Sequence, residues 1–378
     1  MPWKEESVMS QRLKMIEQML LPGAKISELC GRFGISRKTA YKWLSRYEEE
    51  GMAGLEDMSR EPHNQPEKST EEFEDIVINT HKEYPYWGPR KLRDYLLHIE
   101  KLQSVPSHTT LGRILKRRGH KVITSHKSSP APSRFEREQP NELWQMDFKG
   151  SFMTDKNRCH PLTILDDCSR YSIELHACKN EREGTVKERL IEVFKDYGLP
   201  KQINVDNGSP WGCSGLNSVT SLKIWLYKLG VYVSYSAPYH PQTNGKDERF
   251  HRTLKLEVLH DRKYKSCQDI QYTFDSWQHI YNFKRPHEAL NGKTPGSRYY
   301  VSSKKFPDKL PQPEYPSDAI VRKAQEKDGS FSFKGGIYYA GQALGGEYIE
   351  IRETNKIDEF AVFFMDQFIK KCKIGVTI

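Results

Sequence analysis

The chain has 378 residues and a formal net charge of +9; charged residues make up 29% of it and hydrophobic residues 36%. This length allows roughly two to four domains, and the basic balance favours a polyanionic partner, nucleic acid before an anionic membrane surface. No apolar run reaches the length of a membrane span and the first residues carry no secretory pattern, so a membrane or secreted protein is not expected. The seven cysteines never occur as CxxC, which indicates reduced thiols in a cytoplasm and argues against a zinc finger.

The first fifty residues are predicted to form a helix-turn-helix DNA-binding domain, residues 1–50. An apolar helical stripe runs through residues 5–22, a short second helix ends at Gly34, and Ser36 can cap a third helix by accepting a backbone N–H. The second helix of this motif enters the major groove, so we expect DNA contacts from Arg37, Lys38, Thr39, Lys42 and Arg46. A plain three-helix bundle is the alternative.

A second basic helical unit, residues 69–120, follows an expected linker at 51–68. The pattern predicts a helix over about 70–82 and another that begins after Ser107. Two consecutive helix-turn-helix units would follow a long DNA site through phosphate contacts, which we expect from Arg90, Lys91, Lys116 and Arg117. Solvated helix faces are the alternative reading of these charges. Residues 121–140 contain a serine- and proline-rich stretch and are predicted to be an extended linker.

From residue 141 the pattern changes to strands, and residues 141–300 are predicted to form an α/β core. Strands are expected at 143–153, 161–165, 171–177, 202–205 and 231–235, and helices at 183–197, 216–229, around 248 and at 268–284. Three antiparallel strands, helix, strand, helix, strand, helix is the ribonuclease H-like order, a mixed sheet with helices on its faces.

Three acidic residues stand where such a core can bring them together. Asp147 lies in WQMDFKG on the first strand, Asp206 in NVDNGSPW at the end of a short strand, and Glu248 in NGKDERFHRTLK in the first turns of a basic helix. Two aspartates on strands and a glutamate on a helix can converge on divalent metal, whereas three rim carboxylates without metal are the alternative. Asp247 is the nearest rival to Glu248, and Asp166 and its neighbour Asp167 read as turn and cap residues.

These motifs resemble the DDE triad of transposases and retroviral-type integrases, and residues 1 to about 300 are most similar to the IS481 group, near the wider IS3 family. The resemblance implies a transposase that binds terminal inverted repeats of double-stranded DNA, cleaves DNA to expose a 3′-hydroxyl and joins that hydroxyl to target DNA. It also implies at least a homodimer in a synaptic complex. We expect it in the bacterial cytoplasm, associated with the nucleoid. A DNA-binding regulator without catalysis and a nuclease that only hydrolyses are the alternatives.

The chemistry of strand cleavage agrees with the resemblance. Two divalent ions about 3.5–4 Å apart can stabilise the attacking and the leaving oxygen of a phosphodiester, and Mg²⁺ prefers hard oxygen ligands. We expect two Mg²⁺ ions, with Mn²⁺ as a substitute. Asp147 would bridge both ions, Asp206 would complete one site and Glu248 the other.

The helix of Glu248 carries a basic face. Arg252 and Lys255 lie four and seven residues beyond Glu248 and are expected to hold DNA phosphates, while His251 is either on this face or buried. Past the core, residues 306–378 show short alternating stretches with glycine turns, which predict a small, SH3-like β-barrel. Dimerisation and contact with the DNA backbone are its two open roles.

Overall fold

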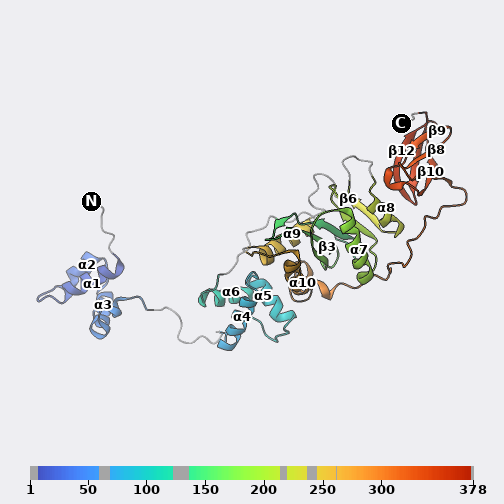
Figure 1. Ribbon diagram of the computed structural model, residues 1–378. Helices are drawn as coiled ribbons and strands as arrows, with labels where there is room; N and C mark the ends of the chain where they lie inside the picture. The colour runs from blue at the N-terminus through green and yellow to red at the C-terminus, as the bar shows by residue number, and fades with distance from the viewer. Residues whose placement is uncertain are drawn as a thin grey trace. The chain divides into compact units, whose positions relative to one another are not determined.

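The computed structural model describes residues 7–58, 69–121, 136–212, 219–235, 245–260 and 262–375. The chain divides into two compact units, Met1–Thr70 and Glu71–Ile378 (Figure 1). Within the described ranges, no helix combines the length and the apolar composition that crossing a membrane requires.

The first unit is a small helical bundle. Its elements are α1 (Val8–Met19), α2 (Ile26–Phe33), α3 (Arg37–Glu50) and the 3₁₀ turn η1 (Gly51–Leu55). Gly34 ends α2 at φ 65°, and the Ser36 hydroxyl accepts the Thr39 N–H, both as predicted. Leu55 is fully buried in the same core as Ile16. The expected linker therefore begins later than residue 51, and residues 59–68 lie outside the described part.

The second unit begins with three more helices, α4 (Glu71–Glu83), α5 (Pro89–His98) and α6 (His108–Arg117). They enclose a core of their own, in which Tyr84 stacks on Trp87 with ring centroids 3.9 Å apart. Ser107 caps α6 as predicted. Most of the linker expected at 121–140 lies outside the described residues, but its end is tied to the next domain because Glu136 pairs with Arg170 at 2.8 Å.

A six-stranded mixed sheet forms the centre of the second unit. Its order is β2-β3-β1-β5-β6, with β4 paired to β3. The strand β1 is antiparallel to β3 and parallel to β5, and β5 is parallel to β6. This is the predicted arrangement, except that the single strand expected at 143–153 is interrupted between β1 and β2. The strands are β1 (Trp144–Phe148), β2 (Phe152–Met153), β3 (Arg158–Asp166), β4 (Ser172–Cys178), β5 (Gln202–Val205) and β6 (Tyr232–Tyr235).

Helices supply two apolar clusters against this sheet. Trp144 and Met146 pack with Phe194 of α7, while Leu165 packs with Phe250 of α9. Because strand side chains alternate between faces, Gln145 and Asp147 of β1 face the α9 side. The remaining elements are α7 (Glu183–Tyr197), α8 (Ser221–Lys228), α9 (Gly245–Leu254), the π-helical turn η2 (Lys255–Leu259), α10 (Cys267–Phe283), η3 (Glu288–Leu290) and η4 (Pro295–Ser297).

The C-terminal module is a sheet and a ribbon. Four antiparallel strands lie in the order β12-β11-β10-β7, and β8 pairs only with β9 among the described strands. The strands expected near 331, 337, 348 and 360 are present. The expected small β-barrel is not confirmed, because among the described residues β12 and β7 are the two ends of the sheet and no pairing closes it. The elements are β7 (Ile320–Lys323), β8 (Ser330–Phe333), β9 (Gly336–Tyr339), η5 (Gln342–Leu344), β10 (Tyr348–Glu353), β11 (Glu359–Phe364) and β12 (Gln367–Lys373).

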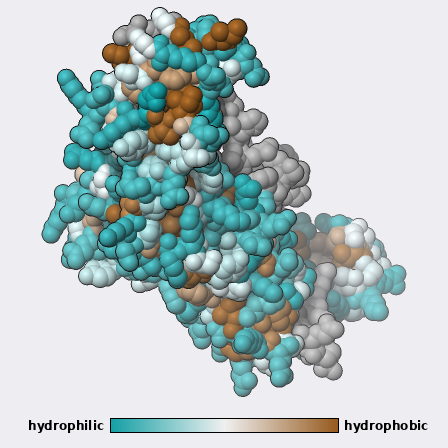
Figure 2. All heavy atoms as spheres, turned by 90° about the vertical axis from the view of Figure 1, so that its right-hand side faces the viewer, coloured by the Kyte–Doolittle hydropathy of each residue, from teal (hydrophilic) through white to brown (hydrophobic). Residues whose placement is uncertain are grey.

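The surface agrees with the mean hydropathy of −0.77. Figure 2 shows a face that is largely hydrophilic, with hydrophobic side chains in small separate patches. Exposed apolar residues of the C-terminal module include Ile337 and Phe368, at 60% and 54% exposure. Scattered exposed apolar side chains of this kind are ordinary on a folded protein.

Candidate active site

The strand β1 presents Asp147 at the edge of the α9 side. Its neighbours Trp144 and Met146 are buried in the core, while the Asp147 side chain is 30% exposed. On the antiparallel partner strand the residue opposite is Thr163, whose hydroxyl donates to the Asp147 carbonyl oxygen at 3.0 Å. Packing of Trp144 and Met146 on one face of the sheet therefore fixes the strand that presents the Asp147 carboxylate on the opposite face.

Asp206 follows β5, the parallel neighbour of β1, so the two aspartates leave adjacent strands at the same edge. The Gly208 N–H donates to Asp206 Oδ1 at 3.0 Å and fixes the carboxylate over its own turn. Beneath the turn, buried Trp211 stacks on Phe148 with ring centroids 5.7 Å apart. The turn that carries Asp206 is therefore held by the Gly208 hydrogen bond and by the contact between Trp211 and Phe148.

The two aspartates influence one another electrostatically. Burial first, and the negative charge of Asp206 second, raise the pKa of Asp147 to about 6. Such a shift is the expected state of neighbouring carboxylates without a cation between them. Two hard oxygen donors at this edge fit Mg²⁺ or Mn²⁺, since a bound cation would stabilise both charged forms.

Glu248 occupies the first turns of α9. Phe250 and Leu254 are fully buried on the inner side of this helix and Asp247, at 3% exposure, also faces inward, whereas Glu248 itself is exposed. Burial first, and Asp147 second, raise the pKa of Asp247 well above its usual range. In the part of the chain that the structure describes, no three His, Cys, Asp or Glu side chains are close enough to hold one metal ion. The structure brings Asp147 and Asp206 together, but not Glu248 with them.

The structure shows which of the two expected positions His251 occupies on α9. His251 is half-buried against the sheet, with 14% of its side chain exposed, and its Nε2 lies 2.8 Å from the Thr163 hydroxyl, so it is not on an open DNA-facing surface. Burial first and then Lys149 lower the pKa of His251 to about 4. Arg252 and Lys255 are exposed, as their predicted role requires.

Sequence reasoning missed Lys149 as a candidate contact. Burial first and then the charge of Lys255 lower the pKa of Lys149, so Lys149 lies near the basic face to which Lys255 belongs. The alternation of side chains along a strand could have identified Lys149, because residues 147 and 149 lie on the same face. The site therefore combines a carboxylate pair with adjacent positive charge.

The expected DNA contacts of the first helical unit lie on α3. Arg37, Lys38 and Lys42 are exposed there. Thr39 and Arg46 are half-buried, and Arg46 lies 5.1 Å from the centroid of the Trp43 ring. The contacts expected from this helix stay predictions.

In the second helical unit the expected contacts have different surroundings. Arg90 and Lys116 are exposed. Burial first and then Arg285 lower the pKa of Lys91 to about 8. Arg117 pairs with the buried Glu74. Arg90 also lies 3.9 Å from the Glu288 carboxylate. All four residues stay predicted DNA contacts.

Comparison with known families identifies the domains in which these residues lie. Residues 137–241 match a family described as an integrase core domain, and residues 229–295 match another of the same description. Residues 11–63 match a helix-turn-helix domain and residues 39–115 a homeodomain-like domain. These matches and the transposase relatives described next support a DDE transposase/integrase. In this transposase/integrase, Asp147 and Asp206 fall in the first core match and Glu248 in the second.

Two relatives extend along most of the transposase/integrase. The transposase of transposon Tn552 from Staphylococcus aureus is 25% identical over 410 aligned residues, covering 95% of this chain and 82% of the relative. A protein named as the transposase of insertion sequence element IS5376 from Geobacillus stearothermophilus is 24% identical over 353 residues, covering 90% and 82%. The HTLV-2 integrase catalytic core structure covers 43% of this chain and 99% of its own, at 15% identity and a TM-score of 0.33.

Proposed function

We propose that this enzyme is the transposase of an insertion sequence of the IS481 group. It binds the element's terminal inverted repeats, cleaves DNA to expose a 3′-hydroxyl and joins that hydroxyl to target DNA on the bacterial nucleoid. The observation that supports this most directly is the pair formed by Asp147 and Asp206, whose mutual repulsion helps raise the pKa of Asp147 to about 6. A strand-end carboxylate pair inside an integrase core is suited to divalent ions.

Asp147, Asp206 and Glu248 would hold two Mg²⁺ ions, with Mn²⁺ as a substitute. When bound, the ions stabilise the attacking and leaving oxygens of the in-line displacement. Asp206 is oriented by the Gly208 N–H, and Asp147 by the sheet on which it lies. Glu248 would approach from α9 and complete the ligand set. Each carboxylate contributes a charged oxygen and no thiol is needed.

Binding of the DNA ends would be the task of the helical units and of the basic face beside the site. Exposed Lys38 and Lys42 on α3 carry the charge that phosphate binding needs. A fragment of residues 1–120 should shift inverted-repeat DNA in a gel, and the double change Lys38→Glu with Lys42→Glu should weaken it. Specific binding of the ends by residues 141–378 alone would contradict this assignment. Pairing of two ends requires at least a dimer, which mass measurement of the DNA complex would detect.

The deciding experiment is cleavage and joining of DNA that carries the native element ends, with Mg²⁺, by the full chain. Asp147→Asn, Asp206→Asn and Glu248→Gln should each abolish both steps while DNA binding survives. Asp247→Asn is the matched control for Glu248→Gln, because the two residues are adjacent and only Glu248 is exposed.

Three outcomes would replace the proposal. Cleavage without joining indicates a nuclease that only hydrolyses. Binding without either reaction indicates a regulator. Loss of activity in Asp247→Asn with retention in Glu248→Gln would exchange the roles of these neighbours.

A further inference from the structure

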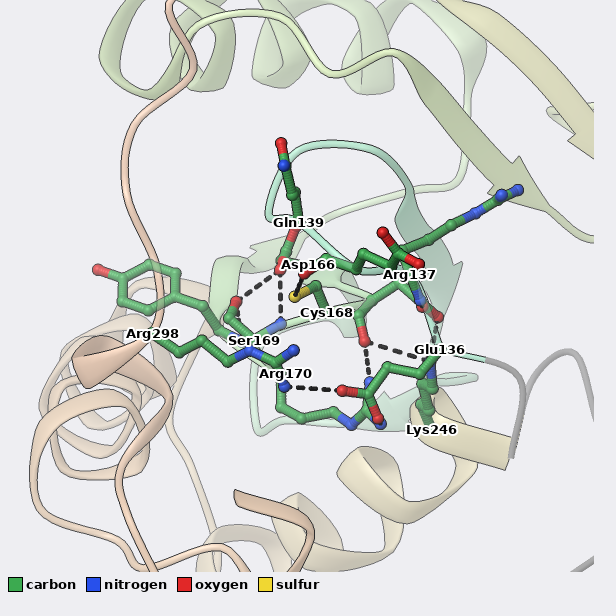
Figure 3. Close-up of polar contacts among 12 residues, drawn as sticks. Glu136, Arg137, Gln139, Asp166, Cys168, Ser169, Arg170, Lys246 and Arg298 are labelled. Carbon is green, nitrogen blue, oxygen red and sulfur yellow. Dashed lines mark hydrogen bonds and ion pairs between the residues drawn. The ribbon is translucent and has the colours of Figure 1, made fainter. Parts of the chain in front are cut away.

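The helix that carries Glu248 is tied to the strand that carries Asp147 by two polar links. The first link begins at Lys246, in the first turn of α9. Its ammonium group pairs with the Asp167 carboxylate and donates to the Asp167 carbonyl oxygen at 3.2 Å. Gln145 Nε2 of β1 donates to the same carboxylate at 2.8 Å. Figure 3 shows Lys246 directed toward the polar cluster around Glu136 and Arg170, beyond the end of β3.

The second link begins at His251, five residues later on the same helix. The Thr163 hydroxyl has a single proton, which it donates to the Asp147 carbonyl oxygen at 3.0 Å. It therefore accepts a hydrogen bond from His251 Nε2 at 2.8 Å. Thr163 is 1% exposed, so water does not compete for this contact. The link ends on the backbone of the residue whose carboxylate faces Asp206.

These two links attach α9 to β1 on either side of Glu248 in the sequence. Lys246 lies two residues before it and His251 three residues after it on the same helix, while their partners reach β1 at Gln145 and Asp147. The apolar contacts of α9, such as Phe250 on Tyr281 at 4.9 Å between ring centroids, hold the helix to the core. Apolar burial is not directional, whereas hydrogen bonds require a definite distance and angle. The links can therefore fix the rotation and the axial position of α9 relative to β1.

We propose that Lys246 and His251 are positioning residues for Glu248: through Asp167 and Thr163 they fasten α9 to β1 and so set the distance between Glu248 and Asp147. The inference rests on the proposed metal-dependent function. Removing a link leaves the carboxylates in place but lets the turn of Glu248 move. The ligand set is then less well organised before the metal binds, and metal affinity falls.

The variants remove one polar group of each link with little change of shape. Thr163→Val removes the hydroxyl of the second link, and Thr163→Ser restores it. Asp167→Asn weakens the first link. Thr253→Val is the matched control, because Thr253 is on α9 and its hydroxyl donates only within the helix, to the Arg249 carbonyl oxygen.

Two measurements on the full chain test the proposal. Hydrogen exchange of the amides of residues 245–259 reports whether α9 is loosened, and calorimetry with MnCl₂ reports metal affinity without DNA or turnover. In Thr163→Val and Asp167→Asn we expect exchange roughly tenfold faster and a Mn²⁺ dissociation constant roughly three- to tenfold higher. Thr163→Ser and Thr253→Val should match the unmodified chain. His251→Ala combined with Thr163→Val should be no worse than either change alone, since both remove one link.

Each other outcome is decisive. Unchanged exchange in Thr163→Val and Asp167→Asn would show that the links do not hold α9. Faster exchange with unchanged Mn²⁺ affinity would make both links merely structural and would overturn the positioning role. If the unmodified chain bound no Mn²⁺, the proposed metal-dependent function would be wrong, and so would the positioning of Glu248 for a metal. Hydrogen exchange would still decide whether the links hold the helix.

Discussion

Asp147 and Asp206 leave neighbouring parallel strands at one edge of the sheet, and the charge of Asp206 is second only to burial in raising the pKa of Asp147 to about 6. The ordinary value is 3.8, so the folded protein binds this proton more tightly than the unfolded chain does. In the absence of a cation, the ionised Asp147 carboxylate therefore lowers the free energy of unfolding relative to an uncharged side chain at this position. Catalytic sites commonly carry this kind of stored repulsion.

Asp147→Asn should stabilise the metal-free protein. Because the folded pKa is raised, the Asp147 carboxylate destabilises the fold increasingly as pH rises from about 4 through 6, and its removal should recover on the order of 2 kcal/mol above pH 6. The advantage should fade below pH 4, where the acid is protonated in both states. Thermal unfolding in EDTA between pH 4 and 8 measures this. Added Mg²⁺ should raise the unfolding temperature of the unmodified chain but not of the variant; a variant less stable at pH 7.5 would contradict the repulsion argued here.

Gly208→Ala should impair catalysis with little effect on stability. A Cβ at this position would lie 3.3 Å from Asp206 Oδ2 and 3.4 Å from Oδ1, so the carboxylate must shift by a few tenths of an ångström. A misplacement of about 1 Å can lower a rate about 100-fold, so we expect this smaller shift to lower the joining rate by up to about tenfold. Gly184→Ala on α7 is the control, since a Cβ there meets nothing within 4 Å. Equal joining rates in the two variants would show that the Asp206 turn adapts freely.

Local sequence signals were sufficient for most of the core. The bounds of α7 and β5 match the prediction, because an apolar helical stripe and a short apolar run each end at a turn. The C-terminal strands β7 and β12 were not predicted. They read Ile-Val-Arg-Lys and Gln-Phe-Ile-Lys-Lys-Cys-Lys, and their lysines suit the edges of a sheet but hide the alternation. Closure into a barrel depends on pairing between distant strands, which no local pattern encodes.

The site was predictable only in its residue types. Motifs identified Asp147, Asp206 and Glu248, but the pairing of Lys246 with Asp167 joins residues 79 positions apart and follows from the fold alone. The same holds for His251 and Thr163, separated by 88 positions. A sequence shows that a polar residue is present, whereas its partner depends on the register of β3 against β1.

Arg117 and Lys116 should behave differently despite their adjacency on α6. Arg117 pairs with Glu74, whose side chain is only 5% exposed, and Arg118 Nε lies 3.1 Å from the same carboxylate. Removing one partner of a buried carboxylate destabilises, here on the order of 1–2 kcal/mol because the arginines are partly solvated. Arg117→Ala should therefore speed hydrogen exchange in residues 71–118. Lys116→Ala should leave exchange unchanged and weaken DNA binding.

A gel-shift titration of both α6 variants with element-end DNA completes this comparison. The structural pairing predicts a smaller loss of DNA affinity for Arg117→Ala than for Lys116→Ala. Reduced affinity in Arg117→Ala with unchanged hydrogen exchange would instead support the DNA contact that the sequence suggests for Arg117.

Arg252→Ala and Lys255→Ala should lower activity most at high salt. Both side chains are exposed beyond Glu248, and Lys149 adds positive charge near Lys255. Each phosphate contact contributes roughly one unit to the slope of log affinity against log salt. At low salt all variants saturate with DNA and join it at similar rates, but as salt rises the variants lose occupancy first. Lys309→Ala, an exposed lysine far along the chain, is the charge-matched control. Mn²⁺ affinity should stay unchanged in both variants, unlike in Glu248→Gln, because a cationic side chain is no metal ligand. Joining rates equal to the control across the salt range would show that this face of α9 does not meet DNA, and the approach of the substrate along Arg252 and Lys255 would have to be abandoned.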